Sequence, residues 1–343
     1  LSESPVKAGV IYAGTDDGFI NITDNDGSSW KSIEVKKLPG VPATAYVNDI
    51  KADNFDVNKV YAVLDNHKYG DYQPYIYTSN DKGKTWKSIT SNLPDRTLTW
   101  RIVQDHVEKN LFFAATEYGI YFSVNSGKSW SKLNGGVPTI SFRDLAIHKR
   151  ENDLVGASFG RGFYVFDDIS VFRELSNSQM NSKATLFSVR KAWWYIARPY
   201  LGFNDPWNGH KGSQGDSYFV APNPPFGAVF TYHLSESLVT QKDSRSKIEE
   251  ASIKKGKAVG FPGWKIVESE RREVDPKVII EVKDKNGDVV RRLEGPISKG
   301  FHRVAWDLRY PSPNSILEGA ASVNVSGFLA PPGEYTVTLY TKV

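Results

Sequence analysis

The first half of the chain alternates short apolar runs with polar turns. The runs are three to five residues long, rich in β-branched and aromatic side chains, and they end at Gly, Asn, Asp, Ser or Thr. This pattern is typical of strands joined by tight turns. Because a membrane helix needs about 20 consecutive apolar residues, the sequence predicts no membrane-spanning helix.

One unit of this pattern recurs, with two apolar strands followed by a polar turn box that ends in Trp. Three boxes have the form Ser/Thr-x-Asp/Asn-x-Gly-x-x-Trp, and their Trp residues are 56 (86 − 30) and 44 (130 − 86) positions apart. We expect the Asp or Asn to accept backbone N–H bonds across the turn and the Gly to supply a positive φ. The defining residues are Thr23, Asn25, Gly27 and Trp30, then Ser79, Asp81, Gly83 and Trp86, then Ser123, Asn125, Gly127 and Trp130.

A further strand precedes the later copies, at 47–50, 100–103 and 142–145. A fourth copy ends in a decayed box, where Phe172 stands in place of Trp. Each unit therefore predicts four short strands, as in a propeller blade. The first copy has no recognisable leading strand, so residues 1–175 are predicted to be about four blades of an incomplete ring that starts inside a blade.

The boxes resemble the Asp-box (BNR) repeats of bacterial sialidases, xyloglucanase-type glycoside hydrolases and the sortilin propeller. That resemblance implies a propeller, with the boxes on the rim away from any ligand. Rings of this repeat have more blades, so it also implies upstream blades of the same protein as partners. An alternative is that residues 186–189 complete blade one and close a small ring.

The second half follows a different pattern. Residues 176–215 predict an aromatic, Gly/Pro-rich connector, and 216–343 an antiparallel sandwich with a charged insertion at 236–277 that holds a solvated helix ending near Gly256. Asn286-Gly287 between two apolar runs predicts a hairpin. Three motifs follow in order: Asp284-x-Asn286-Gly287, Gly300-Phe301-His302-x-Val304-x-Trp306-Asp307 and Pro331-Pro332-Gly333-Glu334-Tyr335. This order resembles the Ig-like domain of flagellar hook-capping proteins. The fold class is thus all-β, a partial propeller followed by an Ig-like sandwich with a short helical insertion.

The whole chain is similar to the C-terminal third of large bacterial proteins described as sortilin-like or BNR-repeat glycosyl hydrolase-like. The resemblance implies a secreted, periplasmic or cell-surface location. The resemblance does not extend to sortilin itself, because the sortilin propeller is followed by a Cys-rich module and this chain has no Cys.

The amino-acid composition excludes several kinds of functional site. The 343 residues include no Cys, which excludes disulfides, thiolate metal sites and a thiol nucleophile. The net charge of +4 is too balanced for a nucleic-acid binder. The six His lack paired metal-ligand spacing, and no phosphate loop or nucleophile elbow is present, so we expect neither a metal nor a cofactor.

Candidate binding residues lie in two places. The segment 64–74 breaks the repeat and predicts a long recognition loop carrying His67, Tyr69, Asp71 and Tyr72. Trp100, Arg101, Arg143 and Arg161 lie on or near successive inner strands. Arg101 aligns with Asp144 and Arg143 with Trp100, so on strands of period two the arginines are not expected to converge as in a sialidase.

Two functions remain open. The first is a non-catalytic binding or scaffold module that engages protein, peptide or glycan. The alternative is the C-terminal portion of a xyloglucanase-like or sialidase-like glycoside hydrolase, which needs two carboxyl groups flanking the scissile bond or, for a sialidase, an Arg cluster with a Tyr nucleophile. Catalytic residues are not identifiable.

Overall fold

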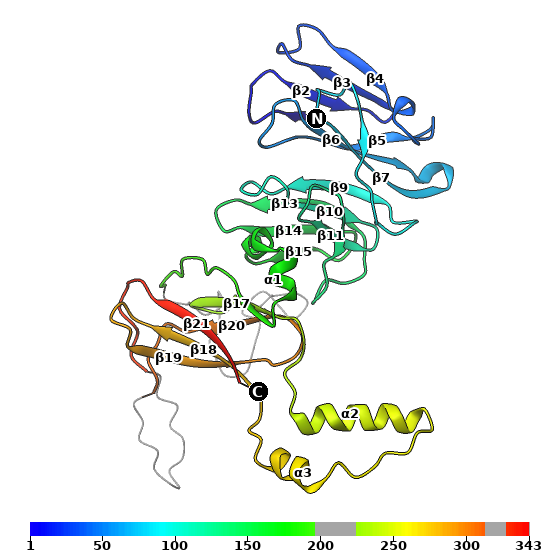
Figure 1. The fold of residues 1–343 in the computed structure, drawn as a ribbon. Coiled ribbons are helices and arrows are strands. Elements are labelled where there is room, and N and C mark those ends of the chain that lie inside the picture. Colours follow the sequence, from blue (N-terminus) through cyan, green and yellow to red (C-terminus); the bar gives the residue numbers. More distant parts are fainter. Residues whose placement is uncertain (196–223, 313–326, 343) are drawn as a thin grey trace, which may run out of the picture. The chain divides into compact units, whose positions relative to one another are not determined.

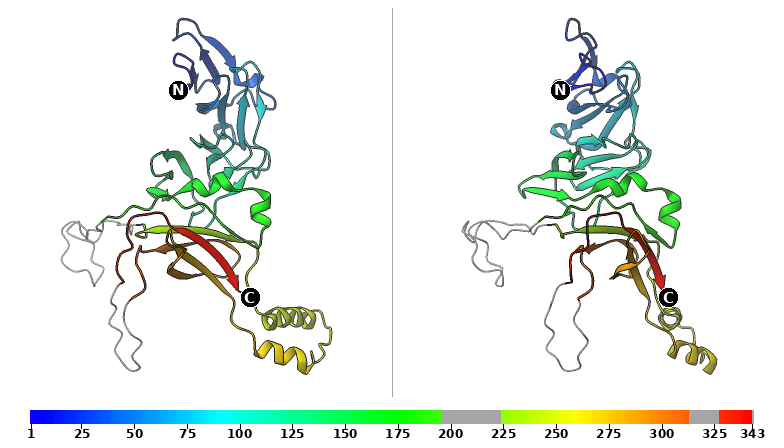
Figure 2. Two further views of the ribbon diagram at one scale, coloured as in Figure 1. Left: turned by 60° about the vertical axis from the view of Figure 1, so that its left-hand side comes forward. Right: turned by 90° about the vertical axis from the view of Figure 1, so that its left-hand side faces the viewer.

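The computed structural model describes residues 1–195, 224–312 and 327–342, and Figure 1 shows the order of the elements. The chain divides into two compact units, Leu1–Leu175 and Ser176–Val343, which are drawn from two further sides in Figure 2. Strands dominate both units, so the prediction of an all-β protein with a small helical insertion is confirmed. Residues 198–209 of the predicted connector and 218–223 of a predicted strand lie outside the described residues.

The first unit holds four antiparallel sheets, which we number as blades 1 to 4. Each of the first three has four strands in sequence order, and in the described residues the fourth has three. The strands are β1 (Ser2–Glu3), β2 (Ile11–Gly14), β3 (Phe19–Thr23) and β4 (Lys31–Glu34); β5 (Tyr46–Ala52), β6 (Val60–Asn66), β7 (Asp71–Ser79) and β8 (Lys87–Ser88); β9 (Thr99–Gln104), β10 (Phe112–Thr116), β11 (Gly119–Ser123) and β12 (Ser131–Lys132); β13 (Phe142–His148), β14 (Asp153–Ser158) and β15 (Phe163–Phe166).

The structure of blade 1 contradicts the prediction about its first strand. The two-residue strand β1 pairs with β2, through Ser2 with Tyr12 and Glu3 with Ile11. It occupies the place of the leading strand in the other blades, so the prediction that the first blade lacks this strand was wrong. Two residues are too few to produce an apolar alternation that sequence reading detects.

The core of the first unit lies between neighbouring sheets rather than within one. Buried side chains of blades 1 and 2 form one cluster, those of blades 2 and 3 a second, and those of blades 3 and 4 a third. Strand β6 is buried along its whole length. Each sheet is therefore covered on a face by the next blade, which is why its inner strands read as continuous apolar runs.

Three short 3-10 helices lie at turns of this unit: η1 (Val35–Lys37), η2 (His67–Tyr69) and η3 (Ile169–Glu174). Helix η2 corrects the predicted recognition loop. Strands β6 and β7 extend to Asn66 and from Asp71, and these two residues pair. Only residues 67–70 connect the strands, so the insertion lengthens a hairpin instead of forming a long loop.

The second unit is a two-layered sandwich. One sheet has the order β16 (Ala184–Leu186), β17 (Ala228–Leu234) and β20 (Gly300–Trp306); the other has β19 (Val289–Gly295), β18 (Lys277–Lys283) and β21 (Thr336–Lys342). Apolar residues of both sheets, such as Phe230 and Ile280, share one buried cluster. Strands β18 and β19 pair as the predicted hairpin, and Gly287 in its turn has φ of 88°. The Ig-like assignment remains a prediction.

Strand β16 changes the interpretation of the predicted connector. Residues 184–186 pair with β17, and the Phe187 N–H donates to Thr231 O. The start of the connector therefore belongs to the sandwich, after the short helix α1 (Asn177–Asn181). The alternative in which residues 186–189 complete blade 1 is wrong, because Leu186 and Phe187 already pair within the second unit.

The charged insertion forms two helices, α2 (Gln241–Lys254) and α3 (Trp264–Arg271). The Thr240 hydroxyl caps α2 by accepting from Asp243 N, and Gly256, with φ of 71°, lies just beyond its end as predicted. Arg245 joins the helices through Glu270, whose carboxylate accepts its Nε and Nη2 at 2.6 and 2.7 Å. None of the helices in the described residues is long and apolar enough to cross a membrane.

Candidate functional site

The leading strands of blades 2, 3 and 4 share a β-bulge at the same position. Along β5, β9 and β13 the pairing skips one residue: Asn48, Trp100 and Arg143. A bulge places two residues opposite one, bends the strand and re-aims a side chain, and bulges are frequent beside binding sites. We call the end of the blades that carries these bulges the front rim. It also holds the turns that join the second and third strands, at 67–70, 117–118 and 159–162.

The bulge residues contact one another from blade to blade. Asn48 Nδ2 donates to Trp100 O at 2.7 Å. The Arg143 guanidinium lies 3.6 Å from the centroid of the Trp100 ring and 5.0 Å from that of Phe159. Trp100 is only 5% exposed, and its Nε1 donates to Glu117 Oε2 at 3.1 Å. Arg143 is exposed, so the stack holds a cation at the surface against two aromatic rings.

His67 joins this stack from blade 2. Its ring packs against Trp100 with centroids 5.7 Å apart, and its Nδ1 lies 2.7 Å from Asp65 Oδ2. Asp65 is 1% exposed and also accepts from the Tyr46 hydroxyl at 2.7 Å. Burial, together with the bond to Asp65, raises the pKa of Tyr46, which therefore remains a neutral donor. The buried carboxylate fixes the imidazole through Nδ1.

One exposed aromatic side chain lies in each of the three front-rim turns. Tyr69 is 66% exposed, Tyr118 is 49% exposed and Phe159 is 69% exposed. A Gly follows each of them in the chain. Lys68 lies 4.6 Å from the Tyr46 ring centroid. The front rim therefore combines aromatic faces with the cations Lys68 and Arg143, a chemistry suited to stacking and to polar or anionic ligand groups.

Arg101 lies one residue beyond the bulge, between the carboxylates of two neighbouring blades. Its Nη1 is 3.1 Å from Asp49 Oδ1, and its Nε is 3.5 Å from Asp144 Oδ1. Asp49 also accepts from Ile102 N at 3.2 Å. Burial raises the pKa of Asp49 although Lys51 and Arg101 act in the opposite direction. The three aligned positions 49, 101 and 144 thus form an alternating charge ladder.

The structure brings together some of the predicted site residues and separates others. His67, Trp100 and Arg143 form one stack. Arg101 belongs to the charge ladder instead, so Arg101 and Arg143 have different partners, as their alignment predicted. Tyr69 and Arg161 lie in turns, whereas Asp71 and Tyr72 begin strand β7, where Asp71 accepts from Tyr75 and Asn66 and Tyr72 lies beside Arg96.

Sequence reasoning missed several residues of the front rim: Tyr46, Asp65, Glu117, Tyr118 and Phe159. They share a position along the repeat, since Tyr46 begins a leading strand, Asp65 lies near the end of a second strand, and Glu117, Tyr118 and Phe159 lie in turns between second and third strands. The bulges could not be predicted from the sequence, because the extra residue of a bulge interrupts the alternation of apolar and polar side chains. Side chains of the leading strands therefore alternate between the two faces of the sheet only after the bulge, from positions 49, 101 and 144 onward.

The turn boxes lie away from this site and are satisfied locally. In blade 2 the Gly83 N–H donates to Ser79 Oγ at 2.7 Å, and Thr85 N donates to Asp81 Oδ1 at 2.8 Å. Blades 1 and 3 repeat these bonds with Asn25 and Asn125. The hydrogen bonds from Thr85 lower the pKa of Asp81 to about 2. Each box Gly and the residue before it have positive φ.

No family model matches the chain, and no curated protein matches it. Among solved structures it is similar to YCF48 bound to a D1 peptide, at 17% identity and a TM-score of 0.36 over 49% of this chain and 50% of that one. It is also similar to an ancestral GH74 enzyme, at 19% identity and a TM-score of 0.37 over 46% and 21%. The GH74 xyloglucanase from Xanthomonas campestris gives 13% identity and a TM-score of 0.37 over 67% and 33%.

The chain spans half or less of the length of each of these three proteins. TM-scores below 0.5 carry no functional information. The propeller-like architecture therefore rests on the four successive antiparallel sheets and the clusters that join them.

Proposed function

We propose that the first unit is a non-catalytic binding module that engages an extended ligand, a protein segment, peptide or glycan, through its front rim. The observation that carries this proposal is the set of equivalent bulges, which hold Arg143 on Trp100 beside exposed Phe159. A bulge repeated in three blades at one rim organises a surface rather than a core. The sandwich is then a spacer or scaffold, and we propose a secreted or cell-envelope location.

The charges at the front rim favour binding over hydrolysis. A glycosidase needs a general acid and a second carboxylate, both accessible to substrate. Asp65 and Glu117 are engaged by Tyr46, His67, Trp100 and Ser141. Their hydrogen bonds position other side chains, which is a structural role.

The experiment screens the full chain against a glycan array and a peptide library, and then measures the best ligand with variants. We expect Arg143→Ala and Phe159→Ala each to weaken binding by about tenfold, the typical cost of losing one stacked or charged contact. Arg150→Ala is the matched control, because Arg150 is an exposed arginine of the same blade, paired with Glu151. Retention of full affinity in both front-rim variants would contradict the proposal.

A glycoside hydrolase remains the second candidate, and one observation favours it. Asp49 and Asp144 both contact Arg101, and burial raises the pKa of Asp49, as in many general acids. Release of reducing ends from xyloglucan or another β-glucan, abolished by Asp144→Asn, would establish this function and overturn the non-catalytic proposal.

A further inference from the structure

The helical insertion of the second unit carries a tip of exposed apolar and basic side chains. Helices α2 and α3 lie side by side and are joined by residues 255–263 (Figures 1 and 2). We call residues 253–266 the tip, which consists of the end of α2, this loop and the start of α3. No predicted site residue lies there, and no tip residue belongs to the buried clusters of the described residues.

The two helices are held together by a clamp away from the tip. Arg245 of α2 donates from Nε and Nη2 to the Glu270 carboxylate of α3, and from Nη1 to Glu249 at 2.6 Å. At about 1.5 Å per helical residue, Lys254 lies about 13 Å along α2 from Arg245. The clamp therefore orders the helix pair without using any side chain of the tip.

Five large apolar side chains of the tip are exposed to solvent. The exposed fractions are 78% for Trp264, 64% for Phe261, 62% for Ile253, 45% for Ile266 and 39% for Val259. The rings of Phe261 and Trp264 pack against each other with centroids 5.1 Å apart, so they form one aromatic group. Exposed apolar side chains that gather in one place mark a surface that binds a protein or a membrane.

The tip is also basic. Residues 251–267 include no Asp or Glu and four lysines: Lys254, Lys255, Lys257 and Lys265. All four are exposed, and in the part of the chain that the structure describes none of them has an ion-pair partner. The apolar side chains are therefore surrounded by positive charge that nothing in the described residues neutralises.

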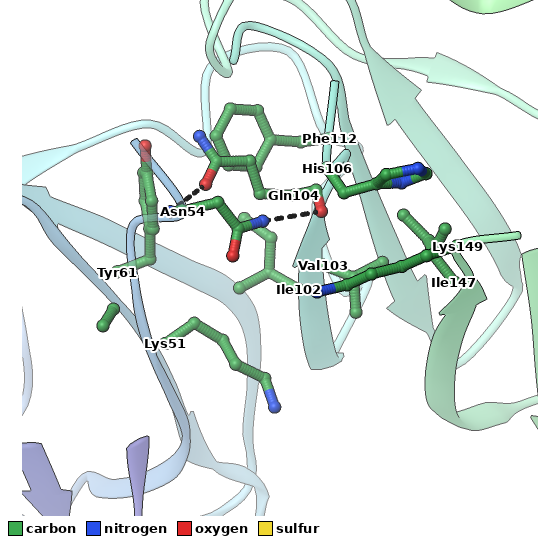
Figure 3. Close-up of a pocket in the computed structure, with 11 residues that line it drawn as sticks. Lys51, Asn54, Tyr61, Ile102, Val103, Gln104, His106, Phe112, Ile147 and Lys149 are labelled. Carbon is green, nitrogen blue, oxygen red and sulfur yellow. Dashed lines mark hydrogen bonds between the residues drawn. The ribbon is translucent and has the colours of Figure 1, made fainter. Parts of the chain in front are cut away.

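A pocket of the first unit shows the contrast. It has a volume of about 200 Å³ and is lined by residues of blades 2, 3 and 4 (Figure 3). Lys51 in this lining is 3.5 Å from Asp49 Oδ1. Asn54 donates to Gln104 Oε1 from its backbone N at 2.8 Å and to Gln104 O from Nδ2 at 3.3 Å. A ligand that approaches Lys51 or Asn54 competes with these partners, whereas the tip lysines have no described partner to displace.

We infer that the tip docks on a lipid surface that carries negative charge. Trp and Phe side chains are stable at the boundary between headgroups and acyl chains. Lysines beside them keep their ammonium groups among the headgroups, and a cluster of four or more attracts anionic lipids. Residues 253–261 are nine consecutive exposed residues, so the tip protrudes. A protrusion can enter a fluid surface without a complementary shape, which a folded acidic protein would have to supply.

This attachment is peripheral. The apolar side chains of one loop and two helix ends give reversible binding, which the lysines strengthen on an anionic surface. The inference does not depend on the function proposed for the front rim, because the tip and the front rim belong to different units. It gives the second unit a role in locating the chain.

The experiment measures sedimentation of the full chain with vesicles of phosphatidylcholine, alone or mixed with phosphatidylglycerol as the anionic lipid, at an ionic strength of about 0.15 M. We expect binding to the anionic vesicles to be at least about tenfold tighter and to weaken as salt is added. Replacing Lys254, Lys255 and Lys257 together by Gln should weaken it by about a hundredfold, because each lysine near an anionic surface contributes about fivefold.

The aromatic group is tested by the double variant Phe261→Ser and Trp264→Ser. We expect it to weaken binding by about tenfold or more, because two large apolar side chains no longer leave water. Trp193→Ser with Trp194→Ser is the matched control, since these residues are 63% and 62% exposed and lie outside the tip.

The charge control replaces Lys242, Lys247 and Lys285 by Gln. These lysines are exposed, lie outside the tip and remove the same total charge. Both controls should bind anionic vesicles as the unaltered chain does. Thermal unfolding without vesicles shows whether each variant keeps its fold, and no shift is expected for the tip variants because they alter no buried cluster.

Three results would overturn the inference. The first is an absence of binding to anionic vesicles. The second is a loss of binding that is the same in the tip variants and their controls, which would show that attraction comes from the charge or the aromatic content of the whole chain. The third is binding of polyglutamate through the tip lysines without binding of vesicles, which would mean that the tip serves an acidic protein.

Discussion

The turn boxes of blades 1 and 3 share the pattern Ser/Thr-x-Asn-x-Gly-x-Ser-Trp and the same internal hydrogen bonds, yet their Trp residues differ completely in environment. Trp130 is 3% exposed, and its Nε1 donates to Ile89 O of blade 2 at 2.8 Å. Trp30 is 49% exposed. The conserved geometry of the turn is therefore local, whereas the energetic value of the Trp comes from the preceding blade.

The box glycines show the same difference. A Cβ added at Gly127 would lie 2.9 Å from Ile89 Cβ, and one at Gly83 would lie 2.3 Å from Ile22 Cδ1 of blade 1. A Cβ at Gly27 would meet only its own Trp30, at 3.5 Å. Each box thus presents a Gly and a Trp to the blade before it, and the contact has an effect only where that blade is present.

Trp130→Ala is expected to lower the unfolding free energy more than any other substitution in these boxes. It removes a buried indole and leaves a cavity between blades 2 and 3, which costs about 3–5 kcal/mol of unfolding free energy. Trp30→Ala should cost well under about 1 kcal/mol, because an exposed side chain loses little burial. Urea unfolding of both variants measures the difference, and equal destabilisation would show that the boxes act only locally.

Arg173→Gln tests a second pair of equivalent positions, Asp105 in blade 3 and Asp53 in blade 2. Asp105 of blade 3 is fully buried and bonded to Arg173, whereas the equivalent Asp53 of blade 2 has Lys59 only at 3.9 Å. Leaving a buried carboxylate without its partner costs about 3–5 kcal/mol. Lys59→Gln, the control, should cost less than about 1 kcal/mol by the same urea measurement.

The same carboxylate predicts a pH dependence. Burial acts to raise the pKa of Asp105, but the bonds from Arg173 and the backbone of Glu108 and Val107 outweigh it and lower the pKa. Its contribution to stability is therefore complete above the unfolded pKa of about 3.9 and is lost as pH falls through the lower folded pKa. Asp105→Asn should flatten the acid limb of a stability profile measured from pH 7 to 2. A profile that keeps the full slope would contradict this assignment.

Gly127→Ala is expected to have an intermediate effect. Gly27 and Gly127 have φ of 80° and 77°, so Ala at either position is strained by about 1 kcal/mol. Only at Gly127 does the added methyl also collide with Ile89, for a further cost of about 1–3 kcal/mol. Thermal unfolding of Gly27→Ala and Gly127→Ala separates the cost of backbone strain from the cost of the collision with Ile89. Equal destabilisation in the two variants would show that the contact with blade 2 contributes nothing.

Asp81→Asn should have the smallest effect. Blades 1 and 3 carry Asn at this position, so the substitution at neutral pH keeps the acceptor geometry. Because the folded pKa of Asp81 is lowered to about 2, its charge persists into strong acid and its protonation weakens the bonds from Thr85 only near that pH. By NMR, the Thr85 amide should titrate near pH 2 while the Ser29 and Ser129 amides do not. An unchanged Thr85 amide would contradict the lowered pKa.

Much of the fold followed from local patterns. The four copies of the repeat, the hairpin at Gly287 and the helix before Gly256 were predicted, because turn chemistry and alternation act over a few residues. Helix α3 was not predicted, and strand β1 was too short to detect. The hairpin extension at 66–71 was interpreted as a loop, because its polar sequence hides strand pairing.

The candidate site was predictable only in part, for the same reason. His67, Trp100 and Arg143 were recognisable as residues of inner strands and an unusual turn, but their stacking required the bulges.

The sequence by itself determined the blades, because each blade is built from strands, turns and boxes whose preferences are set by neighbours in the chain. Only the tertiary structure decided which Trp is buried, which carboxylate is paired with an arginine and which arginine stacks on Trp100. Those outcomes depend on a neighbouring blade, whose contacting residue is 41 positions away for Trp130 and Ile89 and 68 positions away for Asp105 and Arg173. Packing of equivalent positions from successive blades therefore converts a repeated local motif into a surface whose side chains differ from blade to blade.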